Sequence, residues 1–401
     1  MNSAALSYPS IPLSLYIHTP WCIQKCPYCD FNSHAVKNKL PEDIYIKTLI
    51  NDFENNLEYL QNRKIHSIFI GGGTPSLFSA ESYEKLFKAL QRNCKFEKDI
   101  EITIEANPGT FEKNKFSSYK DIGINRLSIG VQSFNENHLK ILGRIHDKNQ
   151  ALQAIEHACN INFPKINIDL MHGLPNQTIK NALDDLGTAI NFNIQHISWY
   201  QLTIENNTYF AKYPPTLPNE DILDEINQQG QAILADNDFY NYEVSAYCKR
   251  QNNNKLINQA KHNLNYWKFG DYLGIGAGAH SKITRTNNDK LEVIRFSKTR
   301  SPNQYLEKFS NIKNFSNNQL LSNYQIIDDK NKAFEFILNA FRLIDGIDLK
   351  LFELRTGLPL EFITKKLKNI ENLKLASVQN NHITLTELGK KYLNNTIEYF
   401  L

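Results

Sequence analysis

The sequence has little net charge and no long apolar run. It holds 45 Lys and Arg residues against 42 Asp and Glu residues, a net charge of only +3 over 401 residues. Nucleic-acid-binding proteins usually concentrate a basic excess on one face, so we expect no nucleic-acid partner. No apolar stretch approaches the ~20 residues of a transmembrane helix. Residues 1–15 also lack the basic start and apolar core of a secretory signal. We therefore expect a cytoplasmic protein without a transmembrane segment.

Cysteine is scarce, and half of the six cysteines form one cluster, Cys22, Cys26 and Cys29. In a reducing compartment, such a cluster indicates metal or redox chemistry before disulfides. The C-x₃-C-x₂-C spacing suits three thiolates on one face of an iron–sulfur cube, which leaves one iron open to a small molecule. The alternative is a zinc site with a distant fourth ligand. Zinc sites usually repeat C-x₂-C pairs, however, and no second pair follows.

The chain is too long for one ordinary core, since single cores stop growing near ~250–300 residues. Six β-rich runs are each followed by a helical stretch. We predict strands at 13–18, 65–70, 100–105, 126–130, 165–170 and 196–203, and helices at 41–61, 79–93, 110–121, 148–160, 178–191 and 220–237. This alternation predicts an α/β fold with parallel strands covered by helices. Six units are too few for a closed eight-unit barrel, so we expect an open partial (β/α)6 barrel.

The alternation fades after residue 240, which suggests three regions. Residues 1–240 would form the barrel. Residues 241–325, which are Gly-rich and then polar, would form a connecting region. Residues 326–401 read as a smaller α+β domain of winged-helix type, with a hairpin turn at Asn380 and Asn381.

Unusual residues follow the predicted strands, at the edge where the active sites of such barrels lie. Gly71, Gly72 and Gly73 follow the second strand, and glycines let a backbone approach a ligand closely. Glu105 and Asp169 end otherwise apolar strands, where a carboxylate needs partners. Taken singly, these residues also fit a tight turn and solvated surface charges.

The cysteine motif, placed after the first strand of such an array, resembles that of the radical S-adenosylmethionine (SAM) superfamily. The resemblance implies a [4Fe–4S] cluster on Cys22, Cys26 and Cys29, whose open iron binds SAM. It also implies an electron donor for the cluster and cleavage of SAM to a radical. The SAM contacts that it implies are Tyr16, Gly72, Gly73, Thr74, Glu105, Gln132, Arg144 and Asp169.

The resemblance covers nearly the whole chain and narrows to the coproporphyrinogen-oxidase-like group. It is carried by the segments 104–110, 125–134, 167–170, 199–203 and 274–280. Two functions from different classes occur in this group. One is the oxygen-independent coproporphyrinogen III oxidase, which removes two propionate carboxyls. The other is the HemW-type heme chaperone, which binds heme as cargo and transfers it to acceptor proteins, including acceptors at a membrane surface.

Three local features favour the chaperone. Phe31 stands where the oxidases carry the last cysteine of C-x₃-C-x₂-C-x-C. Only 21 residues precede Cys22, whereas the oxidases have a long N-terminal segment. His262–Trp267 resembles the H-N-x-x-Y-W element of the chaperones, which makes His262 a candidate heme-iron ligand. A structural histidine among core aromatics is the alternative for His262. We do not expect coproporphyrinogen oxidase activity, and whether SAM is cleaved stays open.

Overall fold

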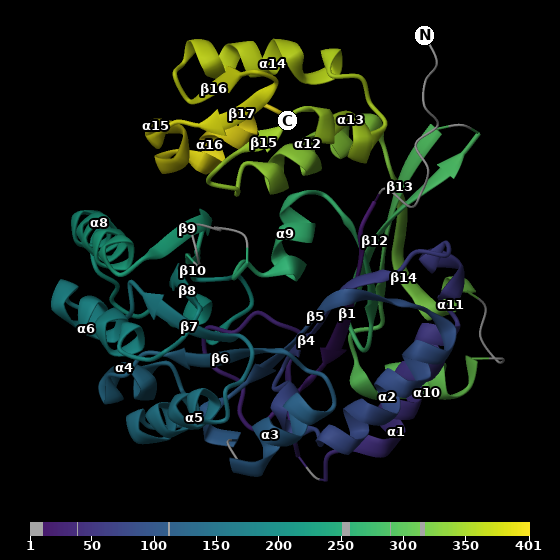
Figure 1. The fold of residues 1–401 in the computed structure, drawn as a ribbon, viewed down its shortest axis with the longest axis vertical. Coiled ribbons are helices and arrows are strands. Elements are labelled where there is room, and N and C mark those ends of the chain that lie inside the picture. Colours follow the sequence, from purple (N-terminus) through teal and green to yellow (C-terminus); the bar gives the residue numbers. More distant parts are fainter. Residues whose placement is uncertain (1–10, 38, 111–112, 251–256, 289, 313–316) are drawn as a thin grey trace.

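The computed structural model describes residues 11–37, 39–110, 113–250, 257–288, 290–312 and 317–401. Most of its strands join one twelve-stranded sheet, in the order β14-β13-β12-β11-β1-β4-β5-β6-β7-β8-β10-β9. Helices line the outer side of the curved sheet, and a smaller unit formed by the C-terminal residues lies across its opening (Figure 1). Among the described residues, no helix is both long and apolar enough to cross a membrane.

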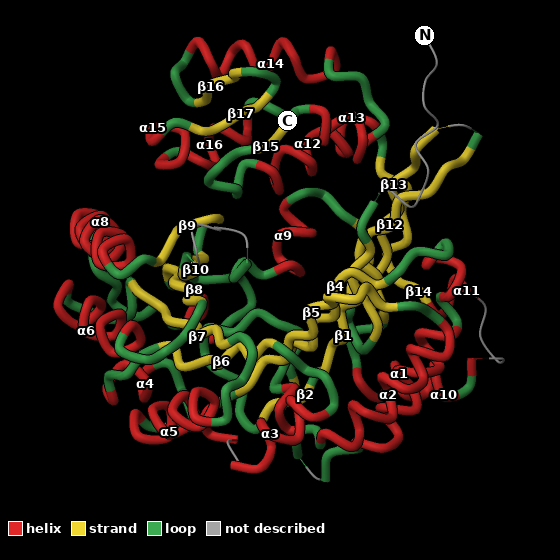
Figure 2. The backbone as a smooth tube through the Cα atoms, in the orientation of Figure 1, coloured by secondary structure: helices red, strands yellow, loops and turns green. Residues whose placement is uncertain are grey.

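Six parallel strands form the centre of the sheet and confirm the predicted strands. They are β1 (Leu13–Thr19), β4 (Ile65–Gly72), β5 (Phe96–Ala106), β6 (Arg126–Gln132), β7 (Ile166–His172) and β8 (His196–Gln201). The helices that follow them are α1 (Glu42–Glu54), α2 (Ala80–Asn93), α3 (Lys113–Asp121), α4 (Glu136–Ile141), α5 (Lys148–Asn160), α6 (Ile179–Ile190), α7 (Tyr209–Lys212) and α8 (Glu220–Asp236). Figure 2 shows these helices outside the strands. The fold is therefore the open partial barrel expected.

The barrel interior follows from the two-residue period of a strand. In β1, Leu13, Leu15 and Ile17 are fully buried members of the main apolar core. The alternate residue Ser14 bonds to Ser67 of β4, with its Oγ atom 2.8 Å from that of Ser67. The apolar face of each strand thus packs on the helices, and the polar face turns into the barrel.

Side-chain caps fix where several helices begin. Ser79 accepts a hydrogen bond from the Ser82 backbone ahead of α2, and Asp147 and Thr178 form capping boxes ahead of α5 and α6. Such caps satisfy backbone N–H groups that have no partner within the helix. They explain why the helix starts agree with the predicted ones.

The region 241–325 is more than a connection, because most of its strands extend the sheet at both edges. Its elements, with the preceding β9, are β9 (Phe239–Glu243), β10 (Ala246–Lys249), α9 (Lys261–Trp267), β11 (Asp271–Ile275), β12 (His280–Asn287), β13 (Lys290–Lys298), α10 (Pro302–Ser310), α11 (Asn317–Leu320) and β14 (Leu321–Ile327). The long strands β12 and β13 look polar in sequence because they carry lysines. Lys282 and Lys298 are nevertheless buried, since Asp271 and Asp52 neutralise them.

The C-terminal residues form a small α+β unit with its own apolar core around Phe336 and Phe352. Its elements are α12 (Asp329–Ala340), β15 (Ile347–Asp348), α13 (Lys350–Thr356), α14 (Glu361–Asn372), β16 (Ala376–Gln379), β17 (His382–Leu385), α15 (Glu387–Lys391) and α16 (Leu393–Glu398). Asn380 and Asn381 form the predicted hairpin turn with φ of 51° and 63°. Asparagine tolerates this left-handed region, which a two-residue turn of this kind requires.

Helix α9 lies between the barrel and the C-terminal unit (Figure 1). Leu264 and Trp267 pack against the core of the C-terminal unit. On the other side, His262 bonds to Ser67 of β4. The helix therefore covers the barrel near the N-terminal ends of its strands.

A buried charged cluster joins β11 to the rest of the sheet. Asp271 is fully buried and lies 2.7 Å from Nη1 of Arg63 and 3.0 Å from Nζ of Lys282. It also accepts hydrogen bonds from the backbone and the hydroxyl of Thr284. Burial alone would raise the pKa of Asp271, but the charges of Lys282 and Arg63 outweigh it and lower the pKa.

We expect Asp271→Asn to lower the free energy of unfolding by about 3–5 kcal/mol, because it leaves two buried cations without a counter-charge. Urea denaturation measures this loss. The matched control is Asp184→Asn, which breaks an exposed pair with Lys180 and should cost no more than about 1 kcal/mol. Equal losses in the two variants would contradict the role given to Asp271.

Candidate functional site

The three clustered cysteines lie on the loop that leaves β1. The short strand β2 (Trp21–Cys22) pairs with β3 (His34–Ala35), and Cys29 N donates to Cys26 O over 3.1 Å, which closes a turn. Burial raises the pKa of Cys22 to about 11, and the neighbouring Cys29 and Cys26 add to the rise. Burial also raises the pKa of Cys29. Thiols whose burial disfavours negative charge need a nearby cation to become thiolates. An iron cluster provides that charge.

The thiols are not arranged for one small ion. Among the described residues, no three His, Cys, Asp or Glu side chains converge closely enough to hold a single metal ion. In a [4Fe–4S] cube each cysteine binds a different iron, so its ligands need not converge on one point.

The glycine loop after β4 supports the cysteine loop. A Cβ atom on Gly73 would lie 2.4 Å from the Trp21 carbonyl oxygen, and one on Gly72 would lie 2.5 Å from the His18 ring. Gly73 N and Thr74 N also donate to the Thr19 and Trp21 carbonyls, each over 2.7 Å. Glycine is therefore required so that the chain carrying Cys22 can pass directly over this loop.

Two buried carboxylates face the barrel interior. Burial, and to a lesser extent the charge of Asp169, raises the pKa of Glu105 to about 8. Among the described residues, its one hydrogen bond comes from Gly72 N over 3.1 Å. Asp169 is better supported, with donors from Ser128 at 2.9 Å and Asn167 at 2.8 Å, yet burial still raises its pKa. Both carboxylates can therefore accept further hydrogen bonds, which the hydroxyl groups of a ligand would donate.

Gln132, the last residue of β6, and Arg144, between α4 and α5, line the same cavity as the cysteines. The pairing of β6 with β7 shifts between Gly130 and Gln132, where Gln132 has a φ of 71°. Arg144 donates to the Gly130 carbonyl over 2.7 Å and contacts the Cys26 sulfur at 3.6 Å. Its buried Nε has no hydrogen-bond partner in the described part of the chain. A guanidinium with a free donor suits a carboxylate ligand.

One cavity of about 350 Å³ collects ten of the twelve predicted site residues. They are Cys22, Cys26, Cys29, Gly72, Gly73, Thr74, Glu105, Gln132, Arg144 and Asp169. Tyr16 does not line this cavity. It lines a neighbouring one of about 370 Å³, which shares Phe31, Gly72 and Glu105 with the first.

His262 lines neither cavity, but it lies behind residues that do: Phe69 lines the first cavity and Tyr266 the second. The His262 side chain is buried, with Nδ1 bonded to the Ser67 hydroxyl at 3.0 Å and its ring against Phe69 and Tyr266. Burial lowers its pKa to about 3. Its Nε2 has no partner among the described residues. Its ring thus packs among aromatic side chains, and its role as a heme ligand stays a prediction.

The cavity also holds residues that the sequence analysis missed. Arg126, Ser128 and Asn167 line it from β6 and β7, together with Tyr28 and Tyr200. The sequence contains a pattern that identifies three of these residues. Arg126 and Ser128 precede Gly130 in steps of two, and Asn167 precedes Asp169 by two. In a strand such residues share a face.

The raised pKa of Glu105 makes stability depend on pH. Between its ordinary value of 4.5 and the folded value of about 8, the folded state binds the extra proton. Stability must then fall as pH rises through this window. We expect the ligand-free protein to lose stability from pH 5 to pH 8 and Glu105→Gln to lose less of it, as measured by urea unfolding. The exposed Glu84→Gln serves as control, and parallel curves for wild type and Glu105→Gln would refute the buried charge.

The chain is similar to known proteins over nearly its whole length. Residues 16–186 match the Radical SAM superfamily, and residues 327–390 match the HemN C-terminal domain. The chain is 47% identical to the heme chaperone HemW of Haemophilus influenzae, over 97% of this chain and 98% of that protein. It is 44% identical to HemW of Escherichia coli, with the same coverage of both chains.

The fold also resembles a solved structure, that of coproporphyrinogen III oxidase (HemN) from Escherichia coli. The TM-score is 0.80 with 23% identity, over 99% of this chain and 92% of that one. At this identity the likeness concerns the fold alone. The identity over nearly the full length is what assigns the family: the chain belongs to the radical SAM superfamily and, within it, to the HemW family of heme chaperones.

Proposed function

We propose that this protein binds heme and delivers it to acceptor proteins, and that it holds a [4Fe–4S] cluster on Cys22, Cys26 and Cys29 with SAM beside it. The observation that carries the proposal is the convergence of ten predicted residues on one cavity below the cysteine loop. The names of the relatives supply heme as the cargo. The acceptors include proteins at a membrane surface, and the setting is the reducing cytoplasm, where a separate protein donates electrons to the cluster.

The residues present fit these groups. The three thiols share one loop and one cavity, and Cys26 contacts the Arg144 guanidinium. Arg144 has a free donor for the SAM carboxylate. Glu105 and Asp169 can accept hydrogen bonds from ribose hydroxyls, which would relieve their buried charge. When bound, the cluster supplies the electron for SAM cleavage.

The oxidase is the second candidate, and Phe31 is the residue that separates the two. Its side chain is 59% exposed and lines the mouth of the cavity, where the resembling oxidases have a cysteine. An oxidase must shield its substrate and radical from water. His262 remains a proposed heme ligand through its free Nε2.

Replacing Cys22, Cys26 or Cys29 by Ala should abolish the brown colour and the content of about four irons per chain after anaerobic reconstitution. Iron analysis and absorption spectra measure this. Cys94→Ala, Cys159→Ala and Cys248→Ala are matched controls outside the cavity, and each should retain the iron. Loss of iron in a control variant instead would show that the ligands are misassigned.

The function is tested on the wild-type protein. We expect a heme absorption band on mixing with heme, and no protoporphyrinogen from coproporphyrinogen III in the presence of SAM and reductant. We also expect that expression will not rescue a strain that lacks coproporphyrinogen oxidase. Rescue, or clear formation of protoporphyrinogen, would support the oxidase in place of the chaperone.

A further inference from the structure

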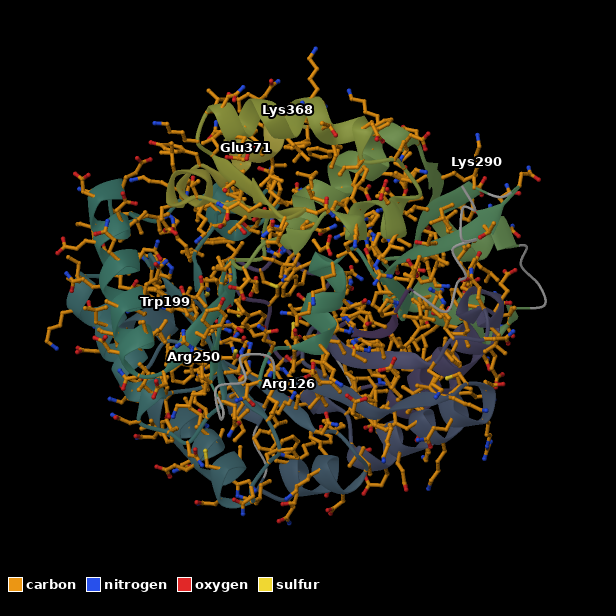
Figure 3. All side chains as sticks on the ribbon, turned by 45° about the horizontal axis from the view of Figure 1, so that its top comes forward. Arg126, Trp199, Arg250, Lys290, Lys368 and Glu371 are labelled. Atoms are coloured by element: carbon orange, nitrogen blue, oxygen red, sulfur yellow. The ribbon has the colours of Figure 1, made fainter. Side chains whose placement is uncertain are left out.

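Arg126 is a buried cation that has no role in the proposed cluster and SAM sites. It begins β6, is 3% exposed and lines the cavity that contains the three cysteines. Its Nη1 is buried without a hydrogen-bond partner, and no described residue forms an ion pair with it. In Figure 3 Arg126 lies near the middle of the molecule, whereas Lys290 and Lys368 lie toward its outline.

The strand register places Arg126 at the far end of the cavity from the cysteines. Gly130 pairs with Asp169, Ser128 with Glu105, and Arg126 with Thr103. Each step of two residues advances ~7 Å along a strand. Asp169 therefore lies nearest the cysteine loop, Glu105 one step deeper, and Arg126 deeper again.

Helix α9 forms the wall at this deep end. His262 of α9 bonds to Ser67, and Ser67 pairs with Glu101, which precedes Thr103 on β5. The next residue of α9, Asn263, lines the same cavity as Arg126. Thr103 has a buried hydroxyl without a partner in the described part of the chain. The deep end thus contains the Arg126 cation and the Asn263 amide, while Thr103 is the register partner of Arg126 and lies outside the cavity lining.

This group of residues is suited to bind a carboxylate. A buried guanidinium without partners is costly. Its planar set of N–H donors fits the two oxygens of a carboxylate. Burial raises the pKa of Asp169, and the charge of Arg126 partly offsets that rise, but the described residues form no ion pair with Arg126. Its Nη1 therefore remains available to the carboxylate of a ligand.

We propose that Arg126 binds the carboxylate of a heme propionate side chain at the deep end of the barrel, leaving the Asp169 end to SAM. This inference rests on the proposed function, since it takes heme as the ligand. SAM also carries a carboxylate and is the other source of the same chemistry. The order along the strands favours heme, because Arg144, the cation beside the cysteines, is already placed for SAM.

The test is a thermodynamic cycle in which the residue at position 126 and the free carboxylates of heme are changed separately and together. Heme and heme dimethyl ester, which lacks free carboxylates, are titrated into wild type, Arg126→Gln and Arg126→Lys. We expect wild type to bind the ester about ten- to a hundredfold more weakly than heme. Arg126→Gln should bind heme as weakly as the ester, so that the discrimination disappears, and Arg126→Lys should retain part of it.

SAM titrations of the reconstituted variants separate the two carboxylate sources. Arg126→Gln should keep its SAM affinity within about twofold, which also shows that it folds. Arg144→Gln, at the other end of the cavity, should lose SAM affinity and keep the preference for heme over its ester.

Equal binding of heme and ester by wild type, or a loss of SAM affinity in Arg126→Gln, would overturn the carboxylate site while leaving the chaperone function intact. Absence of any heme band in wild type is a different result, because it removes the proposed function itself.

Discussion

The barrel interior of this protein carries polar and charged side chains that are largely shielded from water, and the rest of the site depends on which hydrogen bonds and opposite charges each of them finds. The constraint comes from the sheet. Parallel strands covered by helices place every second residue inside. Ser14 and Ser67 satisfy each other, and Asp169 is supported by Ser128 and Asn167. Glu105 keeps a raised pKa, and Arg144 and Arg126 keep N–H donors without a partner among the described residues. We infer that bound ligands interact with these groups.

The same constraint explains how the cysteine loop and α9 define the two ends of the cavity. The chain carrying Cys22 crosses the strand ends only because Gly73 leaves room for it, and Gly72 leaves room for the His18 ring. At the opposite end, α9 is held by the Ser67–His262 bond and by the C-terminal unit behind it. The cavity therefore extends from a thiol-bearing loop to a helix, with two carboxylates between them.

The sequence predicted the six central strands because their apolar positions, such as Leu13 and Leu15, match a buried sheet. It also predicted most of the cavity, because residues that end parallel strands meet at one edge. It missed β12 and β13, since buried Lys282 and Lys298 give core strands a polar appearance. Burial of His262 among core aromatics was predicted from the sequence only as an alternative, because that burial depends on contacts with Ser67 and Phe69, which are distant in sequence.

The central claim is that one cavity holds cluster, SAM and a heme carboxylate in sequence from rim to floor. The most direct measurement is a crystal structure of the anaerobically reconstituted protein with SAM and heme. The account predicts iron on Cys22, Cys26 and Cys29, SAM hydroxyls at Glu105 and Asp169, and a propionate at Arg126. SAM bound outside the cavity, or both propionates in solvent with Arg126 still unpaired, would contradict it.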